Sequence, residues 1–312
     1  VLRFSSTGTI LRVCLSCAES ELMRIVLAVV GLGMLAIIAC GHAENGDPKR
    51  LYIGGIPDQN ESVLVRRFSA VADYLSFSLD VDVRYVPSID YSAVVTGFSN
   101  GDIHLAWFGG LTGVQARVAV DGSQAVAQRP MDQNFRSVFI VNTQTYVDSL
   151  SDLKDTSFTF GSESSTSGHL MPRYFLLEGG IEADEDFSGL PNFSGSHDKT
   201  WKLVESGAFE AGVLNKAVWD KAVGGDKVNL NKVRVLEVTE PYYDYNWTVR
   251  PDLDQYFEEG FTDKLISALF EMREYEEYLT ILELFQTEKF IATTNENYKE
   301  IESVARSLDM LE

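Results

Sequence analysis

The sequence predicts an α/β protein in which helices cover a parallel β-sheet. Between residues 51 and 108, three short apolar runs alternate with two helical patterns, and this alternation is typical of such sheets. The length of 312 residues is enough for two lobes of ordinary domain size. An apolar content of 45% with 11% aromatic residues indicates a globular protein with a substantial core.

The first half of the chain supplies the clearest elements. Leu64, Phe68, Val71 and Leu75 recur at helical spacing, and Asp90-Tyr91 opens a second helix. The expected strands there are 51–55, 81–86 and 103–108. Ligands of parallel sheets bind beyond the carboxyl ends of the strands. The candidate binding loops are therefore 57–62, 88–92 and 107–112.

The second half continues the alternation and ends in helices. Helices are expected over residues 168–178, around Trp201 and Val204, and throughout the chain from residue 260. The segment 242–247 is aromatic and polar, and could cross back between lobes. The expected strands are 137–142, 157–161, 211–214 and 232–238.

The N-terminal region, residues 1–39, has the pattern of a signal peptide. Met23, a possible true start, and Arg24 precede the apolar run 25–38, which is short for a membrane span. The run ends in Ile-Ile-Ala-Cys, which resembles a bacterial lipobox and implies lipidation of Cys40. Residues 40–49 would then be a tether to a bacterial membrane, with the folded part in the periplasm or at the cell surface. The alternative is an ordinary signal peptide or an anchor helix.

Charge and side-chain chemistry exclude several classes of function. A net charge of −20 argues against nucleic acid or anionic lipid as a partner. All three cysteines lie within the first 40 residues, so no disulfide is expected in the folded part. The four histidines show no zinc-ligand spacing. We therefore expect neither a metal nor another cofactor.

The residues Ser165-Thr166-Ser167-Gly168 are a candidate anion site. They lie between an expected strand and an expected helix. Free N–H groups and the positive end of the helix dipole would face a ligand there, and the hydroxyls add donors. The alternative is that one hydroxyl only caps the helix. Spacing alone leaves both interpretations open.

Several motifs together resemble one family. Ser165-Thr166-Ser167-Gly168-His169, Gly195-Ser196-His197-Asp198 and Trp107-Phe108-Gly109-Gly110 occur in the order typical of phosphonate/phosphite-type substrate-binding proteins of ABC transporters. Ile56-Pro57-Asp58-Gln59 is most similar to the branch named for selenate transport. The resemblance covers about residues 50–305. The family commonly has Phe-Gly-Pro at Phe108-Gly109-Gly110, so this chain departs from it there.

The resemblance implies a type II periplasmic-binding-protein fold, in which two α/β lobes joined by a two-segment hinge close on an oxyanion. Lobe 1 would comprise residues 50–137 plus 241–312, and lobe 2 residues 138–240. The hinge would cross near 136–138 and 239–245. The implied partners are a small oxyanion and the ABC permease and ATPase complex, with the binding protein acting as a monomer.

The resemblance also implies which residues bind the ligand. The hydroxyl run would hold the oxyanion and His197 would be a second contact. Glu210 falls where the family often has an Asp for a substrate amino or hydroxyl group, and would favour hydrogen-bearing oxyanions. His169 is either a ligand contact or a brace of the loop, and each strand-end aromatic, Trp107 or Phe108, is either a ligand contact or part of the core. The full expected set is Ser165, Thr166, Ser167, His197, Glu210, Trp107, Phe108, Tyr91 and His169.

We expect a binding protein rather than an enzyme. Ser167, His169 and Asp198 have the residue types of a hydrolase triad, but the first two are only two positions apart at a helix start. A ligand sensor for a separate receptor is the other alternative. The bound oxyanion stays open among phosphate, phosphite, phosphonates and selenium oxyanions.

Overall fold

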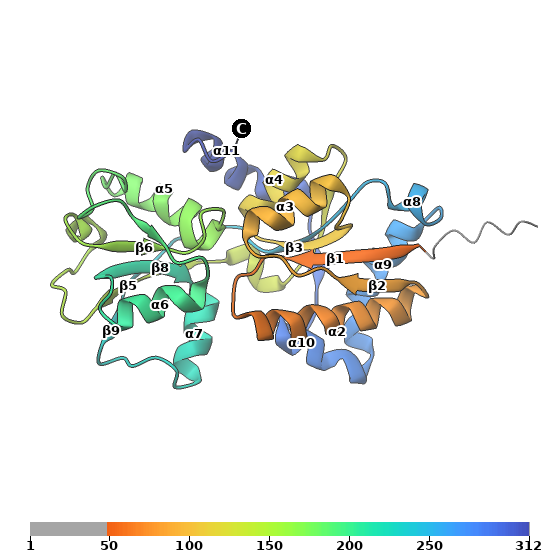
Figure 1. The fold of residues 1–312 in the computed structure, drawn as a ribbon, viewed down its shortest axis with the longest axis horizontal. Helices are drawn as coiled ribbons and strands as arrows, with labels where there is room; N and C mark the ends of the chain where they lie inside the picture. Colours follow the sequence, from red (N-terminus) through yellow and green to blue (C-terminus); the bar gives the residue numbers. More distant parts are fainter. Residues whose placement is uncertain (1–48, 312) are drawn as a thin grey trace, which may run out of the picture. The chain divides into compact units, whose positions relative to one another are not determined.

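The computed structural model describes residues 49–311. The predicted signal peptide, the lipidation site Cys40 and all but the last residue of the tether lie outside these residues. Two β-sheets organise the described chain, one of six strands and one of five. We call the part built on the six-stranded sheet lobe 1 and the part built on the five-stranded sheet lobe 2 (Figure 1).

The sheet of lobe 1 has the order β11-β4-β10-β3-β1-β2. Strand β1 pairs in parallel with β2 and β3, as the alternation predicts. Strand β10 returns from lobe 2 and pairs antiparallel with β3 and β4, so the sheet is mixed rather than parallel. The strands are β1 (Arg50–Gly55), β2 (Asp82–Tyr85), β3 (Leu105–Phe108), β4 (Gln124–Gln128), β10 (Asn246–Val249) and β11 (Ile291–Ala292).

Helices cover both faces of the lobe 1 sheet, with α2 and α10 on one face and α3 and α4 on the other (Figure 1). Asn60 caps α2 by accepting from the Ser62 amide, and Asp90 caps α3 by accepting from the Ala93 amide. Both caps lie within the candidate binding loops 57–62 and 88–92. The helices are α2 (Glu61–Leu79), α3 (Tyr91–Asn100), α4 (Gly110–Ala119), α8 (Leu253–Tyr256), α9 (Phe261–Glu271), α10 (Leu279–Leu284) and α11 (Lys299–Ser307).

The sheet of lobe 2 has the order β7-β6-β8-β5-β9. Strand β6 is parallel to β7 and β8, whereas β5 is antiparallel to β8 and β9. The strands are β5 (Ser137–Asn142), β6 (Phe158–Phe160), β7 (Asn192–Phe193), β8 (Ala211–Asn215) and β9 (Val233–Val238). The helices are α5 (Met171–Glu178), α6 (His197–Glu205) and α7 (Lys216–Gly224).

The chain passes between the sheets twice, between β4 and β5 and between β9 and β10. Phe135 and Tyr242 pair across these two segments through reciprocal backbone hydrogen bonds of 2.8 and 2.9 Å. Two paired crossings are the hinge arrangement that the resemblance implies. The residue limits of the lobes stay a prediction.

An aromatic cluster stabilises lobe 1 behind the cleft. Trp107 packs against Trp247, Phe285 and Phe290, with ring centroids between 5.1 and 5.8 Å apart. Each such buried ring contributes about 2 kcal/mol or more through the hydrophobic effect. The cluster fixes β3, and with it the loop that follows Phe108 into the cleft.

Candidate functional site

The hydroxyl run lies at the carboxyl end of β6 and begins a tight helical turn. Ser165 caps this turn, its hydroxyl accepting from the Gly168 amide at 2.9 Å. Residues Thr166–Leu170 form one π-helical turn before α5. A Cβ on Gly168 would lie 2.9 Å from the Ser165 hydroxyl, so the turn requires glycine there. Ser165, Thr166 and Ser167 are all buried.

Thr166 and Ser167 connect the hydroxyl run to lobe 1 and the hinge. The Thr166 hydroxyl accepts from the Leu111 amide of α4 at 2.9 Å, which joins the two lobes. The Ser167 carbonyl accepts from the Ser137 hydroxyl at 2.7 Å, at the start of the hinge-proximal strand β5. The Ser165 hydroxyl therefore caps the turn, the Thr166 hydroxyl bridges the lobes, and the Ser167 hydroxyl lies beside Asp244.

Asp244 forms the hinge side of the site. Its Oδ1 accepts from the Gly110 amide at 2.9 Å. A proline at position 110 would have no N–H to donate, so the departure from Phe-Gly-Pro supplies this contact. A Cβ on Gly109 would also lie 3.2 Å from Asp244 Oδ1 and 3.1 Å from the Thr166 hydroxyl. The glycine pair allows Thr166 and Asp244 to approach the start of α4.

Burial raises the pKa of Asp244 to about 7, although hydrogen bonds from Gly110, Thr166 and Ser167 favour its charged form. A carboxyl group with this pKa can donate or accept a hydrogen bond near neutral pH. It can therefore share a proton with an oxyanion.

His197 begins α6 and is fully buried. Burial lowers its pKa to about 4, so the ring is neutral at physiological pH. Its Nδ1 lies 3.3 Å from the donating Asn215 amide and is therefore an acceptor. The proton must then be on Nε2, which has no partner among residues 49–311. His197 presents a neutral donor.

Three buried polar atoms without partners among residues 49–311 indicate the candidate binding position. They are Tyr91 Oη, His197 Nε2 and Asp244 Oδ2. Asp58 Oδ1 forms a buried ion pair with Arg67 at 3.6 Å, and the Asp58 carboxylate affects the pKa of both Tyr91 and His197. Buried polar groups normally have hydrogen-bond partners. Three unpartnered groups next to the hydroxyl run fit a small polar ligand held between the lobes.

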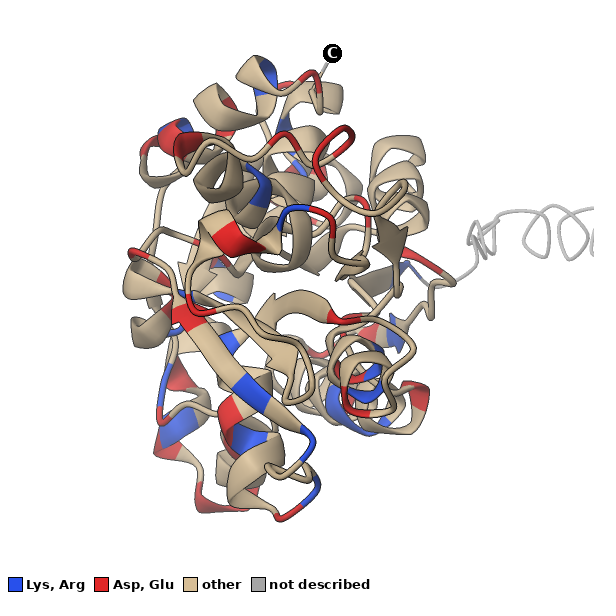
Figure 2. Ribbon diagram, turned by 90° about the vertical axis from the view of Figure 1, so that its left-hand side faces the viewer, with Lys and Arg blue, Asp and Glu red and all other residues tan. Residues whose placement is uncertain are grey.

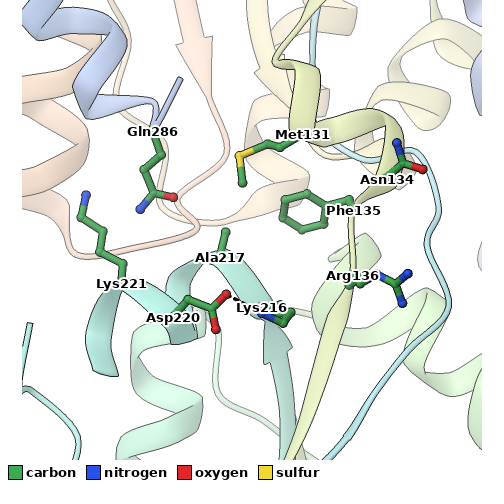
Figure 3. Close-up of a pocket in the computed structure, with 9 residues that line it drawn as sticks. All are labelled: Met131, Asn134, Phe135, Arg136, Lys216, Ala217, Asp220, Lys221 and Gln286. Carbon is green, nitrogen blue, oxygen red and sulfur yellow. Dashed lines mark hydrogen bonds and ion pairs between the residues drawn. The ribbon is translucent and has the colours of Figure 1, made fainter. Parts of the chain in front are cut away.

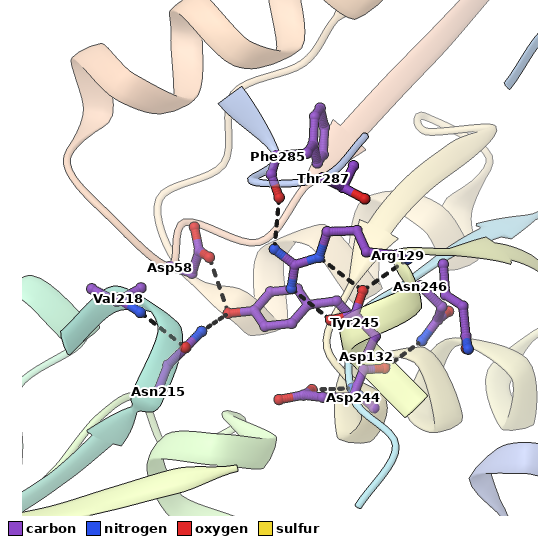
Figure 4. Close-up of polar contacts among 12 residues, drawn as sticks. Asp58, Arg129, Asp132, Asn215, Val218, Asp244, Tyr245, Asn246, Phe285 and Thr287 are labelled. Atoms are coloured by element: carbon purple, nitrogen blue, oxygen red, sulfur yellow. Dashed lines mark hydrogen bonds and ion pairs between the residues drawn. The ribbon is translucent and has the colours of Figure 1, made fainter. Parts of the chain in front are cut away.

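A hydrogen-bonded chain crosses the cleft beside these atoms (Figure 4). Tyr245, at the hinge, donates to Asp58 Oδ2 of lobe 1 at 3.0 Å and accepts from Asn215 of lobe 2 at 3.2 Å. The His197 amide donates to the Asp58 carbonyl at 3.2 Å. The described conformation is thus a closed one in which Asp58 contacts both lobe 2 and the hinge.

The structure brings together five of the residues expected from the sequence: Tyr91, Ser165, Thr166, Ser167 and His197. Asp58 and Asp244 were missed. Asp58 lies in the expected loop 57–62, and Asp244 lies in the aromatic segment that was expected to cross between lobes. Both positions were marked as sequence features, but neither pattern shows which carboxylate faces the cleft.

Glu210 is not at this site. It precedes β8 at the amino end, and five residues of strand, about 16 Å, separate it from Asn215 at the cleft end. Its carboxylate is exposed and accepts from the Ser157 amide at 2.8 Å. It therefore ties β8 to the segment before β6.

Three other expected contacts have structural partners instead. His169 bonds through Nδ1 to the Glu163 carbonyl at 2.7 Å and through Nε2 to Arg173 at 3.2 Å, so it braces the loop. Phe108 packs edge-on against Phe98 in the core, with ring centroids 5.5 Å apart. Trp107 stacks on Tyr245 with ring centroids 5.6 Å apart and supports the hinge rather than a ligand.

A cavity of about 390 Å³ beside the hinge is a poorer candidate (Figure 3). Two of its charged side chains already have partners, since Lys216 pairs with Asp220 and Arg136 donates to the Thr239 carbonyl, which leaves Lys221 as its one unpaired cation within residues 49–311. Charged residues of both signs are spread over the ribbon rather than collected on one face (Figure 2). The site must therefore attract an anion locally.

Within residues 49–311, no cluster of three or more His, Cys, Asp or Glu side chains could hold a metal ion. The helices of this part of the chain are also all too short or too polar to span a bilayer.

Two lobes that close over convergent donors and a buried carboxyl define a solute-binding protein of the periplasmic type. Residues 53–298 match the family described as the phosphonate periplasmic substrate-binding protein of ABC transporters. The chain belongs to this family.

Individual relatives agree with the assignment. The chain is 43% identical over 272 residues to the probable ABC transporter phosphite-binding protein PhnD1 of Prochlorococcus marinus, covering 85% of this chain and 92% of that protein. The structure of PhnD1 in complex with methylphosphonate matches with a TM-score of 0.81 over 85% of this chain and 100% of that chain. The phosphonates-binding periplasmic protein of Escherichia coli is 25% identical over 207 residues, 64% of this chain and 60% of that protein.

Proposed function

We propose that this protein captures a small phosphorus oxyanion, phosphite or methylphosphonate, and delivers it to an ABC permease with its ATPase. The observation that carries the proposal is the set of three unpartnered buried polar atoms, on Tyr91, His197 and Asp244, around the hydroxyl run. The 43% identical relative is named for phosphite, and its structure contains methylphosphonate. A monomer tethered through a lipid on Cys40 completes the proposal.

The donor set fits a tetrahedral oxyanion. The hydroxyl run, the Tyr91 hydroxyl and the neutral Nε2–H of His197 can each donate to an anionic oxygen. The dipole of the turn that Ser165 caps adds to the attraction. No cationic side chain is needed, because donors in a dry cleft are stronger than in water.

Asp244 supplies the discrimination. Phosphite, phosphonates and phosphate titrate near neutral pH and can share a proton with a carboxyl group of pKa about 7. Sulfate and selenate carry no such proton, so Asp244 must take one from solvent when they bind. The site should therefore prefer phosphorus oxyanions. Selenate, for which the similar branch of the family is named, is the less favoured ligand.

The test is a calorimetric and thermal-shift titration of residues 41–312 with phosphite, methylphosphonate, phosphate, 2-aminoethylphosphonate, sulfate and selenate near pH 7.5. Ligand at a hundredfold excess over Kd stabilises the folded state by about 2.7 kcal/mol. We expect the largest shifts with phosphite and methylphosphonate. A largest shift with selenate, or no shift with any phosphorus oxyanion, would contradict the proposal.

A further inference from the structure

A second groove of about 600 Å³ is lined by residues of both lobes. Lobe 1 contributes the first turns of α2 and Leu284 of α10, and lobe 2 contributes α6 and α7. None of the three hydroxyl-run residues, nor Asp58, Tyr91, His197 or Asp244, lines it. It is therefore separate from the oxyanion site.

The groove is basic in an acidic protein. The chain has 46 acidic and 26 basic residues, yet four basic side chains and one carboxylate line the groove. The carboxylate, Asp198, is already paired with Lys202 at 3.1 Å. Arg66 of lobe 1 and Lys221 and Lys227 of lobe 2 form no ion pair with any other residue in 49–311. Three positive charges from two lobes are left uncompensated.

These charges lie close enough to act on one another. The pKa of Lys221 is lowered by partial burial and then by the positive charges of Arg67, Lys227 and Arg66. Figure 3 shows Lys221 extending from α7 on the side of the hinge cavity where Gln286 of lobe 1 lies. Lobe closure therefore brings like charges together, and an anion between them would relieve the repulsion.

The groove also has an apolar lining. Val63, Val218 and Leu284 contribute to it, together with the ring of Trp201. Trp201 is 6% exposed, and its Nε1–H has no hydrogen-bond partner in the described part of the chain. Apolar surface beside cations and an unused buried donor suits a ligand with an organic body and a multiply charged head.

We propose that this groove is a second binding site for an organic polyphosphate of the nucleoside-triphosphate class. The polyphosphate contacts Arg66, Lys221 and Lys227, and the organic body contacts the apolar lining. Because residues of both lobes form the site, its ligand binds the closed conformation preferentially and raises the affinity for the oxyanion by linkage. This coupling rests on the proposed function, whereas the site itself does not.

The test titrates ATP, without magnesium, into the protein alone and into the protein saturated with phosphite. We expect binding in both cases, tighter with phosphite, and weaker binding of tripolyphosphate, which lacks the organic body. The phosphite affinity should rise with ATP by the same factor as the ATP affinity rises with phosphite. The Lys221→Gln/Lys227→Gln variant should bind ATP about tenfold more weakly.

The matched control is Lys154→Gln/Lys232→Gln, which removes two exposed lysines of lobe 2 outside the groove. It should bind ATP like the wild type, and both variants should bind phosphite normally without ATP. Equal loss of ATP binding in the two variants would show non-specific attraction and overturn the proposal. Displacement of phosphite by ATP, or no ATP binding to the wild type, would also overturn it. If phosphite does not bind, the proposed function is contradicted. The ATP titration of the free protein then still tests the groove.

Discussion

The two walls of the proposed oxyanion site have opposite chemistry. The lobe 2 wall consists of hydroxyls, a turn N-terminus and the neutral donor His197. The wall from lobe 1 and the hinge contributes two buried carboxyl groups, Asp58 and Asp244, with the hydroxyl of Tyr91. The first wall can hold any tetrahedral oxyanion, because donors respond only to negative charge.

The second wall responds to protons as well as charge. A carboxyl group beside an anion repels it unless one of the two carries a hydrogen. We therefore infer that the affinity for the anion depends mainly on lobe 2, and the selectivity among anions mainly on the hinge side. Substitutions on the two walls should separate these two properties.

The largest effect on affinity is expected from His197→Ala. The variant loses a buried N–H donor to a charged ligand, worth about 1.5–3 kcal/mol, or about 10- to 150-fold in Kd. The loss should apply to phosphite and sulfate alike, since the donor does not distinguish them. Calorimetry with both anions measures it.

His169→Ala is the matched control, because His169 is also a buried histidine of lobe 2 but has partners on both nitrogens. It should lower the melting temperature and leave the affinity within about threefold. If His169→Ala lost as much affinity for both anions as His197→Ala, the assignment of His197 as the donor to the ligand would be contradicted.

The next effect is on selectivity, from Asp244→Asn. The amide keeps an acceptor for the Gly110 N–H but cannot exchange a proton. The wild-type preference for phosphite over sulfate should fall by about tenfold, and the loss of sulfate affinity above about pH 7 should disappear. Titrations at pH 6 and pH 8 test this. An unchanged preference at both pH values would remove Asp244 from the selectivity mechanism.

Asp244 should also affect the stability of the ligand-free protein. Its folded-state pKa of about 7 exceeds the ordinary value of 3.8, so the folded state binds more protons than the unfolded state between these values. Wild-type stability is thus lost as the pH rises from about 4 to about 7, by at most about 1.4 kcal/mol per pH unit. Relative to wild type, Asp244→Asn should become more stable over this range. His169 and His197 titrate identically in both proteins and cancel in the difference.

A smaller effect is expected from Tyr245→Phe. The hydroxyl that links Asp58 to Asn215 is removed, while the ring keeps its stack on Trp107. Closure should weaken by about 1 kcal/mol, or about fivefold in Kd for every ligand. Tyr74→Phe is the control, because its hydroxyl donates to the Ala268 carbonyl within lobe 1. Equal affinity loss in the two variants would contradict a role of the cross-cleft chain.

Sequence patterns predicted the parts of the fold that depend on local order. Strand–helix alternation located β1 to β3 and α2 to α3, and the hydroxyl run marked the start of the turn after β6. The alternation predicted the parallel pairing of β1 with β2 and β3. It did not predict the antiparallel strands β10 and β5, because these enter their sheets beside distant segments. The short strands β7 and β11, of two residues each, carry no periodicity to detect.

The site was predictable where it follows one strand, and not where it depends on the hinge. Asp244 is brought to Thr166 and Ser167 by the return of the chain between β9 and β10. Nothing in its sequence neighbours distinguishes it from other carboxylates among 46 acidic residues. The resemblance to the family placed the carboxylate at Glu210 instead, which precedes β8 at the end of the strand away from the cleft.

The smallest effect, and the sharpest test of the assignment, is expected from Glu210→Gln. The amide oxygen can still accept from the Ser157 amide, so the melting temperature should change little. Because Glu210 is exposed at the amino end of β8, affinity and the preference for phosphite over selenate should stay within about twofold. Calorimetry on Glu210→Gln beside Asp244→Asn compares two carboxylates of which only one is buried at the site. The contrary result is that Glu210→Gln alters the preference for phosphite over selenate and Asp244→Asn does not. The carboxyl group that distinguishes protonated oxyanions would then lie outside the closed cleft, and the assignment of selectivity to the hinge wall would fail.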